Sequence, residues 1–412
     1  MSFGPIKLQY VLLYAIVGAW MPYLPVYLED LGMRADQIGW IVGVYGFAVL
    51  VMPAIVAAVA DRWMSNRTLI GISYLLSLLL LVGVATSDTF LALLVFSMFF
   101  SMAYTPLFAL TDGMAFAAMH DVEESGRQPP PYHRLRIWGS IGFIVPSLAL
   151  FALMRYSGAS SRVAIVTAAV ASGVALLATP LLPLTRRAAA EVRQKMPTIE
   201  AWRALITRPV IHLVGPLFLM FVAISLFYVF YTIYLRNLGI AGEWLGLIVN
   251  IGVVAEVAMM LFSGRLLQWF GVKGLMVLGA VSMALRLGLI AAVPTVPVAL
   301  ATQLLHAPIV LALYVVPPMY LNLKATRSYR NSMQGAYGAL CFGVARLAGS
   351  IAGGYVAADR GQAGIIEAFW LAAGLSAAAM VWLLAAFRDA QANAEMKRLS
   401  GALAPQTTAA EV

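Results

Sequence analysis

Residues 8–28 read LQYVLLYAIVGAWMPYLPVYL, an uncharged and largely apolar stretch that directly follows Lys7. A helix needs about 20 predominantly apolar residues to cross the roughly 30 Å hydrocarbon core of a bilayer. No small-x-small cleavage pattern ends the run within the usual reach of a signal peptide. We therefore predict that this stretch is an uncleaved membrane-spanning helix.

Similar stretches recur along the rest of the chain. They lie near 37–60, 68–86, 89–118, 133–154, 163–184, 209–235, 244–266, 273–293, 296–322, 331–357 and 364–387. The chain has 412 residues, of which 62% are hydrophobic and only 11% are charged, whereas charges occupy about a quarter of the positions in a soluble domain. Because so few charges cannot cover a surface in water, we predict an all-α polytopic membrane protein with twelve transmembrane helices.

The positions of lysine and arginine predict how these helices are oriented. Basic residues are enriched in cytoplasmic loops. If both termini are cytoplasmic, the inner segments hold twenty of the 27 basic residues. We therefore expect a multi-pass protein of the bacterial inner membrane with both termini in the cytoplasm. This placement also explains the net charge of +9 without nucleic acid as a partner.

The longest polar interval divides the chain into nearly equal parts. We predict an N-terminal six-helix bundle at 1–184, a cytoplasmic linker at 185–208, a C-terminal six-helix bundle at 209–390 and a disordered cytoplasmic tail at 391–412. A single cysteine, Cys341, rules out an intramolecular disulfide and a multi-cysteine metal site. The sequence has neither an ATP-binding loop nor a compact acid–base or metal cluster. We expect no cofactor, no metal and no enzymatic activity.

The loops after the second and eighth spans carry related motifs. They read AAVADRWMSNR at 57–67 and GRLLQWFGVK at 264–273. Both resemble the loop signature GxxxDRxGRR of the major facilitator superfamily, in which two parallel six-helix halves enclose a substrate site near mid-membrane. The first copy keeps the Asp-Arg core, so we expect Asp61 and Arg62 to act in gating through charge-assisted hydrogen bonds. A solvated loop charge that only sets topology is the alternative.

Three further motifs are TPLFALTD at 105–112, YHRLRIWGSIGF at 132–143 and GVVAEV at 252–257. They resemble the branch of that superfamily that contains lactose permease, nucleoside–proton symporters and phenylpropionate permease, and the resemblance implies proton-coupled uptake. Gln303 and His306 match a Lys-x-x-His arrangement in span ten of lactose permease. Ile309 stands where that permease has an acid.

Ionisable side chains inside a span are costly, and they serve a transport pathway or pair with one another. Glu256, Arg286 and His306 lie at similar depths, since a helix rises about 1.5 Å per residue. Burial favours the protonated form of an acid and a neighbouring arginine favours the charged form, so relative movement of the two would exchange a proton. We predict that Glu256 carries the proton and that Arg286 and His306 modulate it. The alternatives are a structural ion pair between Glu256 and Arg286, and a helix-to-helix hydrogen bond for His306.

Other polar side chains are candidates for binding the substrate. Asp112 in span four and Arg136 in span five should meet near the inner mouth, as a substrate-contacting, gating or packing pair. The stretches RIWGSI at 136–141 and RLAGSI at 346–351 look like a repeat, although their expected depths differ. Arg346 together with Arg286 suits a carboxylate, whereas Asn250 and Gln303 suit a nucleoside or a sugar.

Aromatic side chains supply the rest of the predicted substrate site. Trp20 and Tyr23 in span one, and Tyr228 and Tyr231 in span seven, lie in equivalent helices of the two halves, and their spacing of three places each pair on one helix face. Aromatic walls with a few polar groups suit a planar ring or a sugar face. The alternative is the aromatic belt of the membrane interface.

These features together predict a secondary active transporter. We expect a proton-coupled symporter that imports a nucleoside, sugar or aromatic acid by alternating access, with protons, the solute and the lipid bilayer as partners and a monomer as the unit. The runner-up is a proton-coupled antiporter that exports drugs or metabolites. A receptor or scaffold would gain by losing its buried charges, and a channel would need a re-entrant filter segment that the sequence lacks.

Overall fold

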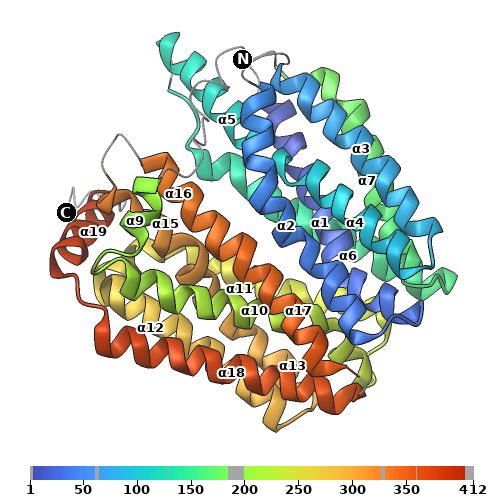
Figure 1. The fold of residues 1–412 in the computed structure, drawn as a ribbon. Coiled ribbons are helices and arrows are strands. Elements are labelled where there is room, and N and C mark those ends of the chain that lie inside the picture. Colours follow the sequence, from blue (N-terminus) through green and yellow to red (C-terminus); the bar gives the residue numbers. More distant parts are fainter. Residues whose placement is uncertain are drawn as a thin grey trace, which may run out of the picture. The chain divides into compact units, whose positions relative to one another are not determined.

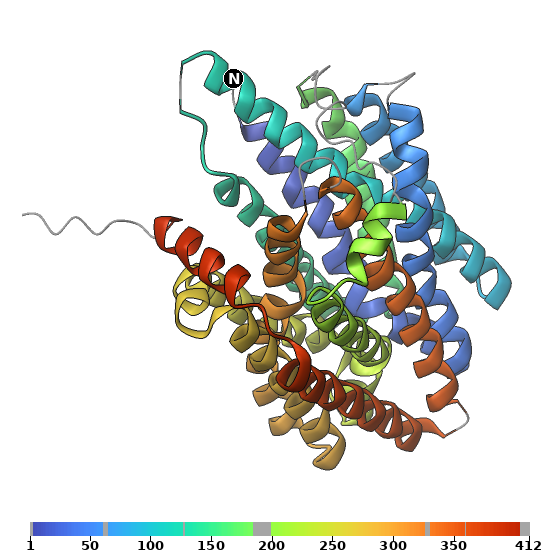
Figure 2. The same cartoon turned by 60° about the vertical axis from the view of Figure 1, so that its left-hand side comes forward.

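The computed structural model describes residues 3–60, 65–126, 128–183, 199–325, 330–358 and 360–403. Within these ranges twelve helical segments are long and apolar enough to cross a membrane, which confirms the predicted fold class (Figures 1 and 2). The segments are Gly4–Asp30, Ala35–Pro53, Asn66–Thr86, Phe90–Glu124, Arg134–Ser157, Arg162–Leu181, Ile211–Asn237, Gly242–Leu261, Ser263–Ala292, Val296–Lys324, Ser332–Ala357 and Gly361–Ala386.

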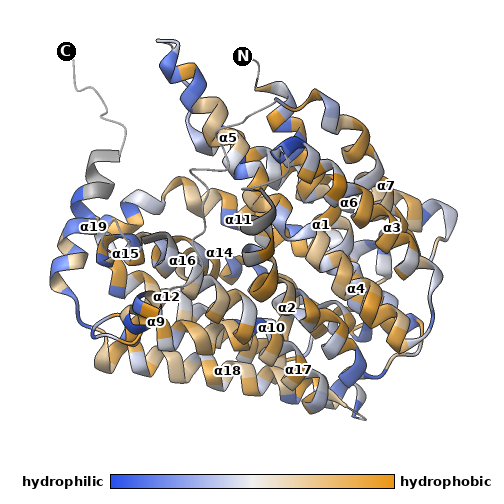
Figure 3. Ribbon diagram, turned by 45° about the horizontal axis from the view of Figure 1, so that its top comes forward, coloured by the Kyte–Doolittle hydropathy of each residue, from blue (hydrophilic) through white to orange (hydrophobic). Residues whose placement is uncertain are grey.

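Nine of the spans are built on one main helix each. These helices are α1 (Gly4–Asp30), α2 (Ala35–Ala60), α3 (Asn66–Thr86), α6 (Tyr132–Ser157), α7 (Arg162–Ala178), α10 (Ile211–Asn237), α11 (Leu245–Leu261), α12 (Ser263–Ala292) and α18 (Gly361–Ala386). The short 3-10 turns η1 (Thr179–Leu181) and η2 (Gly242–Trp244) follow α7 and precede α11. Figure 3 shows hydrophobic residues along these helices and hydrophilic ones toward helix ends and loops, as a bilayer requires.

Spans four, ten and eleven are each built from several helical segments. Span four consists of α4 (Phe90–Tyr104) and α5 (Pro106–Glu124), because proline cannot continue the hydrogen-bond ladder. Span ten runs through α13 (Val296–Ala301), η3 (Thr302–Leu305), α14 (His306–Val310), the π-helical η4 (Leu311–Val315) and α15 (Val316–Lys324). Span eleven runs through α16 (Arg330–Gly338), the π-helical η5 (Ala339–Val344) and α17 (Ala345–Ala357). The short helices α9 (Ile199–Leu205) and α19 (Ala390–Leu403) lie outside the spans.

The chain divides into two compact units, each drawn from several stretches of sequence. The first comprises 1–196, 224–250 and 338–368, and the second comprises 197–223, 251–337 and 369–412. Residues 184–198 of the predicted linker lie outside the described part of the chain. The predicted boundaries of two six-helix halves therefore stay a prediction.

Close packing of α1 against α6 organises the first unit. A Cβ atom on Gly18 would lie 2.1 Å from the backbone oxygen of Phe143, and one on Gly142 would lie 2.2 Å from that of Val11. Small residues let membrane helices approach to backbone contact in this way. The helices are close because only hydrogen atoms occupy these two positions.

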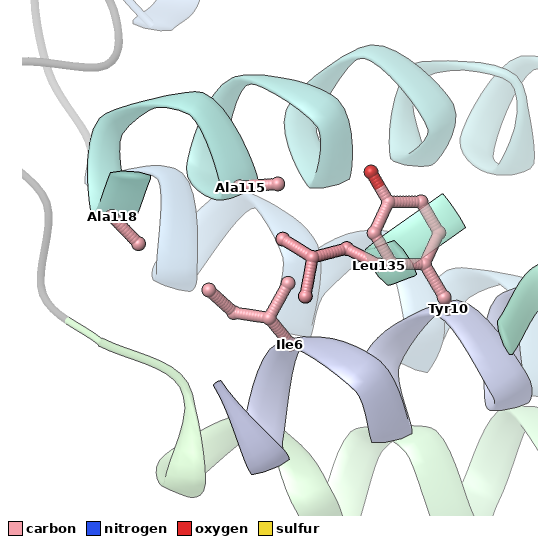
Figure 4. Close-up of a cluster of buried hydrophobic side chains, with 5 residues drawn as sticks. All are labelled: Ile6, Tyr10, Ala115, Ala118 and Leu135. Atoms are coloured by element: carbon pink, nitrogen blue, oxygen red, sulfur yellow. The ribbon is translucent and has the colours of Figure 1, made fainter. Parts of the chain in front are cut away.

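A hydrophobic cluster at the N-terminal end of α1 joins three helices of this unit. It consists of Ile6, Tyr10, Ala115, Ala118 and Leu135, which come from α1, α5 and α6. Figure 4 shows these side chains together, with the Tyr10 hydroxyl pointing toward α5. The cluster thereby fixes the rotation of α1 and the direction of this hydroxyl.

In the second unit, α19 lies where the composition predicts a disordered tail. Its Asn393 side chain accepts a hydrogen bond of 2.9 Å from the backbone N–H of Val272. That N–H follows Gly271, whose φ of 63° and ψ of −177° break α12, and the Asn393 side chain therefore caps the following helical segment. Met396 of α19 is buried. The described part of the tail is thus an ordered helix packed on α12.

Asp389, directly before α19, holds this helix to span ten. Its carboxylate pairs with Lys324 at 2.5 Å and accepts a hydrogen bond of 2.8 Å from the Tyr320 hydroxyl. Burial alone would raise the pKa of Asp389, but the hydrogen bonds from Lys324, the Ala392 backbone and Tyr320 outweigh it and hold this pKa below the usual value. The carboxylate form is therefore the one that stabilises the docked helix.

We expect Asp389→Asn to lower the free energy of unfolding by about 1 kcal/mol at neutral pH, because the substitution removes charge-assisted hydrogen bonds. The pKa of Asp389 is lower in the folded protein than in the unfolded chain, where aspartate titrates near pH 4. The carboxylate therefore contributes its full stability above that pH, and the contribution is lost as the pH falls through the folded-state pKa. Melting curves of wild type and variant in detergent should therefore converge at acidic pH. A difference that persists unchanged there would contradict this role of the charge.

Candidate functional site

The candidate proton-coupling site begins with an irregular stretch of span ten. Pro308 has no amide hydrogen and clashes with the carbonyl four residues earlier, and the chain forms the 3-10 turn Thr302–Leu305 just before it. Residues three apart lie on the same side of such a turn. Gln303 and His306 therefore extend from one face of span ten.

Arg286 of α12 binds both of these side chains. Its Nη2 donates to the Gln303 Oε1 at 2.6 Å, and its Nη1 lies 3.1 Å from the His306 Nδ1. Arg286 is 1% exposed. A charged guanidinium buried to this degree requires hydrogen-bond partners, and span ten supplies two of them.

Glu256 reaches the other side of the His306 ring. Its Oε2 lies 3.7 Å from the His306 Nε2. The preceding turn of α11 approaches span ten closely, since a Cβ on Gly252 would lie 3.0 Å from the Gln303 Oε1 and 3.1 Å from the His306 Cβ. Gly252 lies one turn before Glu256 on the same helix face. It lets the two helices approach until the carboxylate reaches the imidazole.

The order of these groups determines the tautomer of His306. Arginine has only donors, so the Nδ1 facing Arg286 accepts, and a neutral ring carries its proton on Nε2. That proton faces Glu256, so the imidazole separates the carboxylate from the guanidinium. The three residues predicted to couple protons are thus brought together, with His306 in the middle of a row and Gln303 at its end.

A second polar cluster lies in the first unit, around Asp112 of α5. Its Oδ1 accepts hydrogen bonds from the hydroxyls of Tyr10 at 2.6 Å and Tyr132 at 2.8 Å. Among the described residues, no ion pair joins Asp112 to Arg136, and their expected role as a substrate-contacting, gating or packing pair stays a prediction. The cluster of Figure 4 turns the Tyr10 side chain toward α5, which brings its hydroxyl to this carboxylate.

Arg136 and Arg346 instead stack on aromatic rings. The guanidinium carbon of Arg136 lies 4.3 Å from the centre of the Tyr14 ring, and that of Arg346 lies 4.3 Å from the centre of the Tyr45 ring. A Cβ on Gly139 would lie 2.7 Å from Arg136 Nη1 and 2.8 Å from Tyr14. The absence of a side chain at Gly139 leaves room for the first of these stacks.

The other predicted substrate residues of the first unit differ in surroundings. Trp20 packs on Phe100 with ring centres 4.8 Å apart and is half-buried. Tyr23 is fully buried, and its hydroxyl accepts a hydrogen bond of 3.1 Å from the Gly246 backbone N–H. Asn250 is 6% exposed, and no described group hydrogen-bonds its amide.

On α10, Tyr228 and Tyr231 lie on either side of Phe227 in sequence. Their ring centres are 5.4 Å and 4.5 Å from that of Phe227. Tyr231 is buried and Tyr228 is half-buried. The predicted gating pair Asp61 and Arg62 lies outside the described residues.

Several polar residues of span one escaped the prediction. Gln9 donates hydrogen bonds to the Tyr74 hydroxyl at 2.8 Å and to the Thr111 hydroxyl at 3.1 Å, while Tyr10 and Tyr14 contact the Asp112 and Arg136 groups. The one signal in the sequence was the run of polar and aromatic residues on the first turns of an otherwise apolar helix.

At the opposite end of α1, an ion-pair cluster joins it to α10. Arg236 forms ion pairs with Glu29 and Asp30. Asp30 also accepts a hydrogen bond of 2.5 Å from the hydroxyl of Ser161, which precedes α7. This cluster lies at the membrane side opposite the N-terminus, where the first and seventh spans both end.

Comparison with known proteins places these features in a family. A model of the MFS_1 like family matches residues 4–368. The chain is 27% identical over 353 residues to the putative nucleoside transporter YegT of Escherichia coli (strain K12), which covers 82% of this chain and 80% of that protein. It is 26% identical over 308 residues to the probable 3-phenylpropionic acid transporter of the same organism, which covers 73% and 77%.

Solved structures agree in fold. The crystal structure of the nucleoside transporter NupG matches with a TM-score of 0.81 and 20% identity over 93% of this chain and 98% of that chain. Twelve spans and these relatives define a secondary transporter of small solutes, which is not an enzyme. The chain belongs to the MFS_1 like family and is a multi-pass membrane protein.

Proposed function

We propose that the protein is a proton-coupled symporter that imports a small organic solute by alternating access. One observation supports this most strongly: His306 lies between Glu256 and Arg286 inside a membrane span. Ionisable groups at such depth serve transport pathways by default. A carboxylate whose counter-charge lies beyond a neutral imidazole can exchange a proton when the imidazole or the guanidinium shifts.

In the proposed cycle Glu256 is the group that gains and loses the proton. When Glu256 is charged, Arg286 balances it through the His306 ring. When Glu256 is protonated, the guanidinium keeps its hydrogen bond to Gln303 and carries the net charge of the row. The two protonation states therefore differ in the field they create, which gives proton binding a means of favouring one conformation.

The conformational change proposed here involves the ion pairs of Arg236. They tie the end of α10 to the end of α1 and can close the pathway on that side only while they are formed. With the predicted orientation, that side faces away from the cytoplasm. Opening toward the outside would then require Arg236 to leave Glu29 and Asp30.

The solute itself is proposed from the relatives and from the chemistry of the candidate residues. The relatives' names specify nucleosides, xanthosine, maltose and 3-phenylpropionic acid. Trp20, Tyr23, Tyr228, Tyr231 and Asn250 offer aromatic surface and an amide to such compounds. We also propose a location in the bacterial inner membrane, cytoplasmic termini and a monomeric unit.

Uptake into proteoliposomes tests the proposed function. With uridine, xanthosine, maltose and 3-phenylpropionate as probes, an acidic exterior should drive accumulation of at least one of them above equilibrium, and a protonophore should abolish it. Accumulation driven instead by an acidic interior would favour the antiporter. Transport that no pH gradient in either direction affects would contradict proton coupling.

A further inference from the structure

Two arginines of the first unit occupy equivalent places in a repeated motif. Arg136 begins RIWGSI at 136–141 and Arg346 begins RLAGSI at 346–351. Each guanidinium carbon lies 4.3 Å from the centre of a tyrosine ring, Tyr14 in one case and Tyr45 in the other. The repeat in the sequence is therefore also a repeat of contact geometry.

Neither of these guanidiniums has an acidic partner among the residues that the structure describes. Asp112, the acid expected from the sequence to lie near Arg136, accepts hydrogen bonds from two tyrosine hydroxyls through its Oδ1. Arg136 and Arg346 are half-buried, unlike the fully buried Arg286. Positive charge at membrane depth is costly without compensation, and a ring face at this distance contributes only about 0.5–2 kcal/mol.

Stacking on a ring uses the flat face of the guanidinium and leaves its edge available. The edge carries five N–H donors in a fork that matches a carboxylate. In Arg286 the corresponding donors bind Gln303 and His306. In Arg136 and Arg346 no described side chain ion-pairs with the fork, and neither residue is fully buried.

The two stacks border one group of tyrosines. The Tyr14, Tyr45 and Tyr104 hydroxyls lie in one neighbourhood of the first unit. Tyr14 and Tyr104 each contact the Phe108 ring edge to face, with centres 5.3 Å and 5.4 Å apart. An aromatic surface thus lies next to two available cations.

We propose that Arg136 and Arg346 bind the anionic group of the transported solute, so that this solute is a small organic acid carried as its monovalent carboxylate. The inference rests on the proposed function and narrows its solute to one class. The anion supplies the negative charge that neither guanidinium finds among the described residues. The rings of Tyr14, Tyr45 and Tyr104 then suit an aromatic or other flat apolar body.

Binding to the purified full-length protein in detergent tests the charge requirement without transport. The probes are benzoate and 3-phenylpropionate, their uncharged amides, and uridine. We expect a carboxylate to bind about tenfold more tightly than its amide, because the amide lacks roughly one charge-assisted hydrogen bond. An amide that binds as well as its acid, or failure of every carboxylate in the set to bind, would overturn the inference.

Variants separate recognition from folding. Arg136→Gln and Arg346→Gln should each weaken carboxylate binding about tenfold and leave the affinity of the amide unchanged, while Arg346→Lys restores only part of the affinity because lysine lacks the fork. Tyr45→Phe keeps the stack and should bind normally, whereas Tyr45→Leu should not. Arg360→Gln is the matched control, since that exposed arginine pairs with Glu367. Equal weakening of acid and amide would show that the arginines are structural.

The electrical behaviour of transport distinguishes this inference from the proposed function. One proton on Glu256 and one monovalent anion move no net charge, so a potassium diffusion potential should leave accumulation unchanged. Symport of a neutral solute with a proton would respond to that potential, and this result would contradict the anionic solute but agree with proton symport. Carboxylate binding without any gradient-driven accumulation would contradict proton symport but agree with the anion site.

Discussion

Replacing Glu256 by glutamine is expected to abolish proton-driven accumulation in proteoliposomes while leaving exchange of solute across the membrane at a rate near that of the wild type. Glutamine has the shape of protonated glutamic acid but cannot release a proton. Its amide oxygen can occupy the place of the Oε2 that lies 3.7 Å from the His306 Nε2, so the row from Glu256 to Arg286 keeps its geometry. The variant should therefore behave as a transporter held in the protonated state.

Exchange and accumulation measure different parts of the cycle. Exchange needs only the substrate-loaded carrier to change conformation, whereas accumulation needs the proton to leave on one side. Glu367→Gln is the matched control, because Glu367 pairs with Arg360 and is about half exposed. Unchanged accumulation in Glu256→Gln would remove Glu256 as the proton carrier. Loss of exchange together with accumulation would show instead that the carboxylate is needed to hold the helices together.

The twelve spans could be predicted because a bilayer imposes a length and a composition that can be read directly from a sequence. Interruptions within spans were harder to predict. Proline predicts a break, and the turn before Pro308 obeys that rule. The π-helical stretches Leu311–Val315 and Ala339–Val344 depend on how the helices pack and have no comparable signal.

Depth along a helix could also be predicted, but rotation about it could not. A rise of about 1.5 Å per residue brought Glu256, Arg286 and His306 to one level. Their order follows from local details, namely the 3-10 turn that aligns His306 with Gln303 and the close approach at Gly252. A direct pair between Glu256 and Arg286 was an equally reasonable prediction until the imidazole was placed between them.

Tyr10, Tyr14, Tyr45 and Tyr132 were the main omission from the predicted site, which included only Tyr23, Tyr228 and Tyr231. In a membrane span a tyrosine is read as part of an aromatic belt or as apolar filling. Its hydroxyl partner depends on tertiary contacts, such as the cluster that turns Tyr10 toward Asp112. The stacks of Arg136 on Tyr14 and of Arg346 on Tyr45 show that the repeat between spans five and eleven concerns the partners of the arginines rather than their depth.

Gly18→Ala and Gly142→Ala are each expected to destabilise the folded protein by more than about 1–3 kcal/mol, the usual cost of over-packing. The added Cβ would lie 2.1 Å from the Phe143 oxygen in the first variant and 2.2 Å from the Val11 oxygen in the second. Backbone atoms cannot turn aside as a side chain can, so α1 and α6 must separate. Size-exclusion profiles and melting temperatures of the purified variants in detergent measure the effect.

Gly173→Ala on α7 is the matched control, which shows what the same substitution does to stability where no backbone lies in contact. The same change there places a Cβ 3.7 Å from a flexible Leu78 methyl group, an ordinary contact distance. Alanine favours a helix by up to about 1 kcal/mol over glycine, so Gly173→Ala should be neutral or stabilising. Only helix-to-helix backbone contact can reverse that preference at Gly18 and Gly142.

Because α1 carries Tyr10 and Tyr14 and α6 carries Tyr132 and Arg136, a separation of these helices would also pull the Asp112 and Arg136 clusters apart. If all three alanine variants melted alike, close packing of α1 on α6 could not be what positions those side chains.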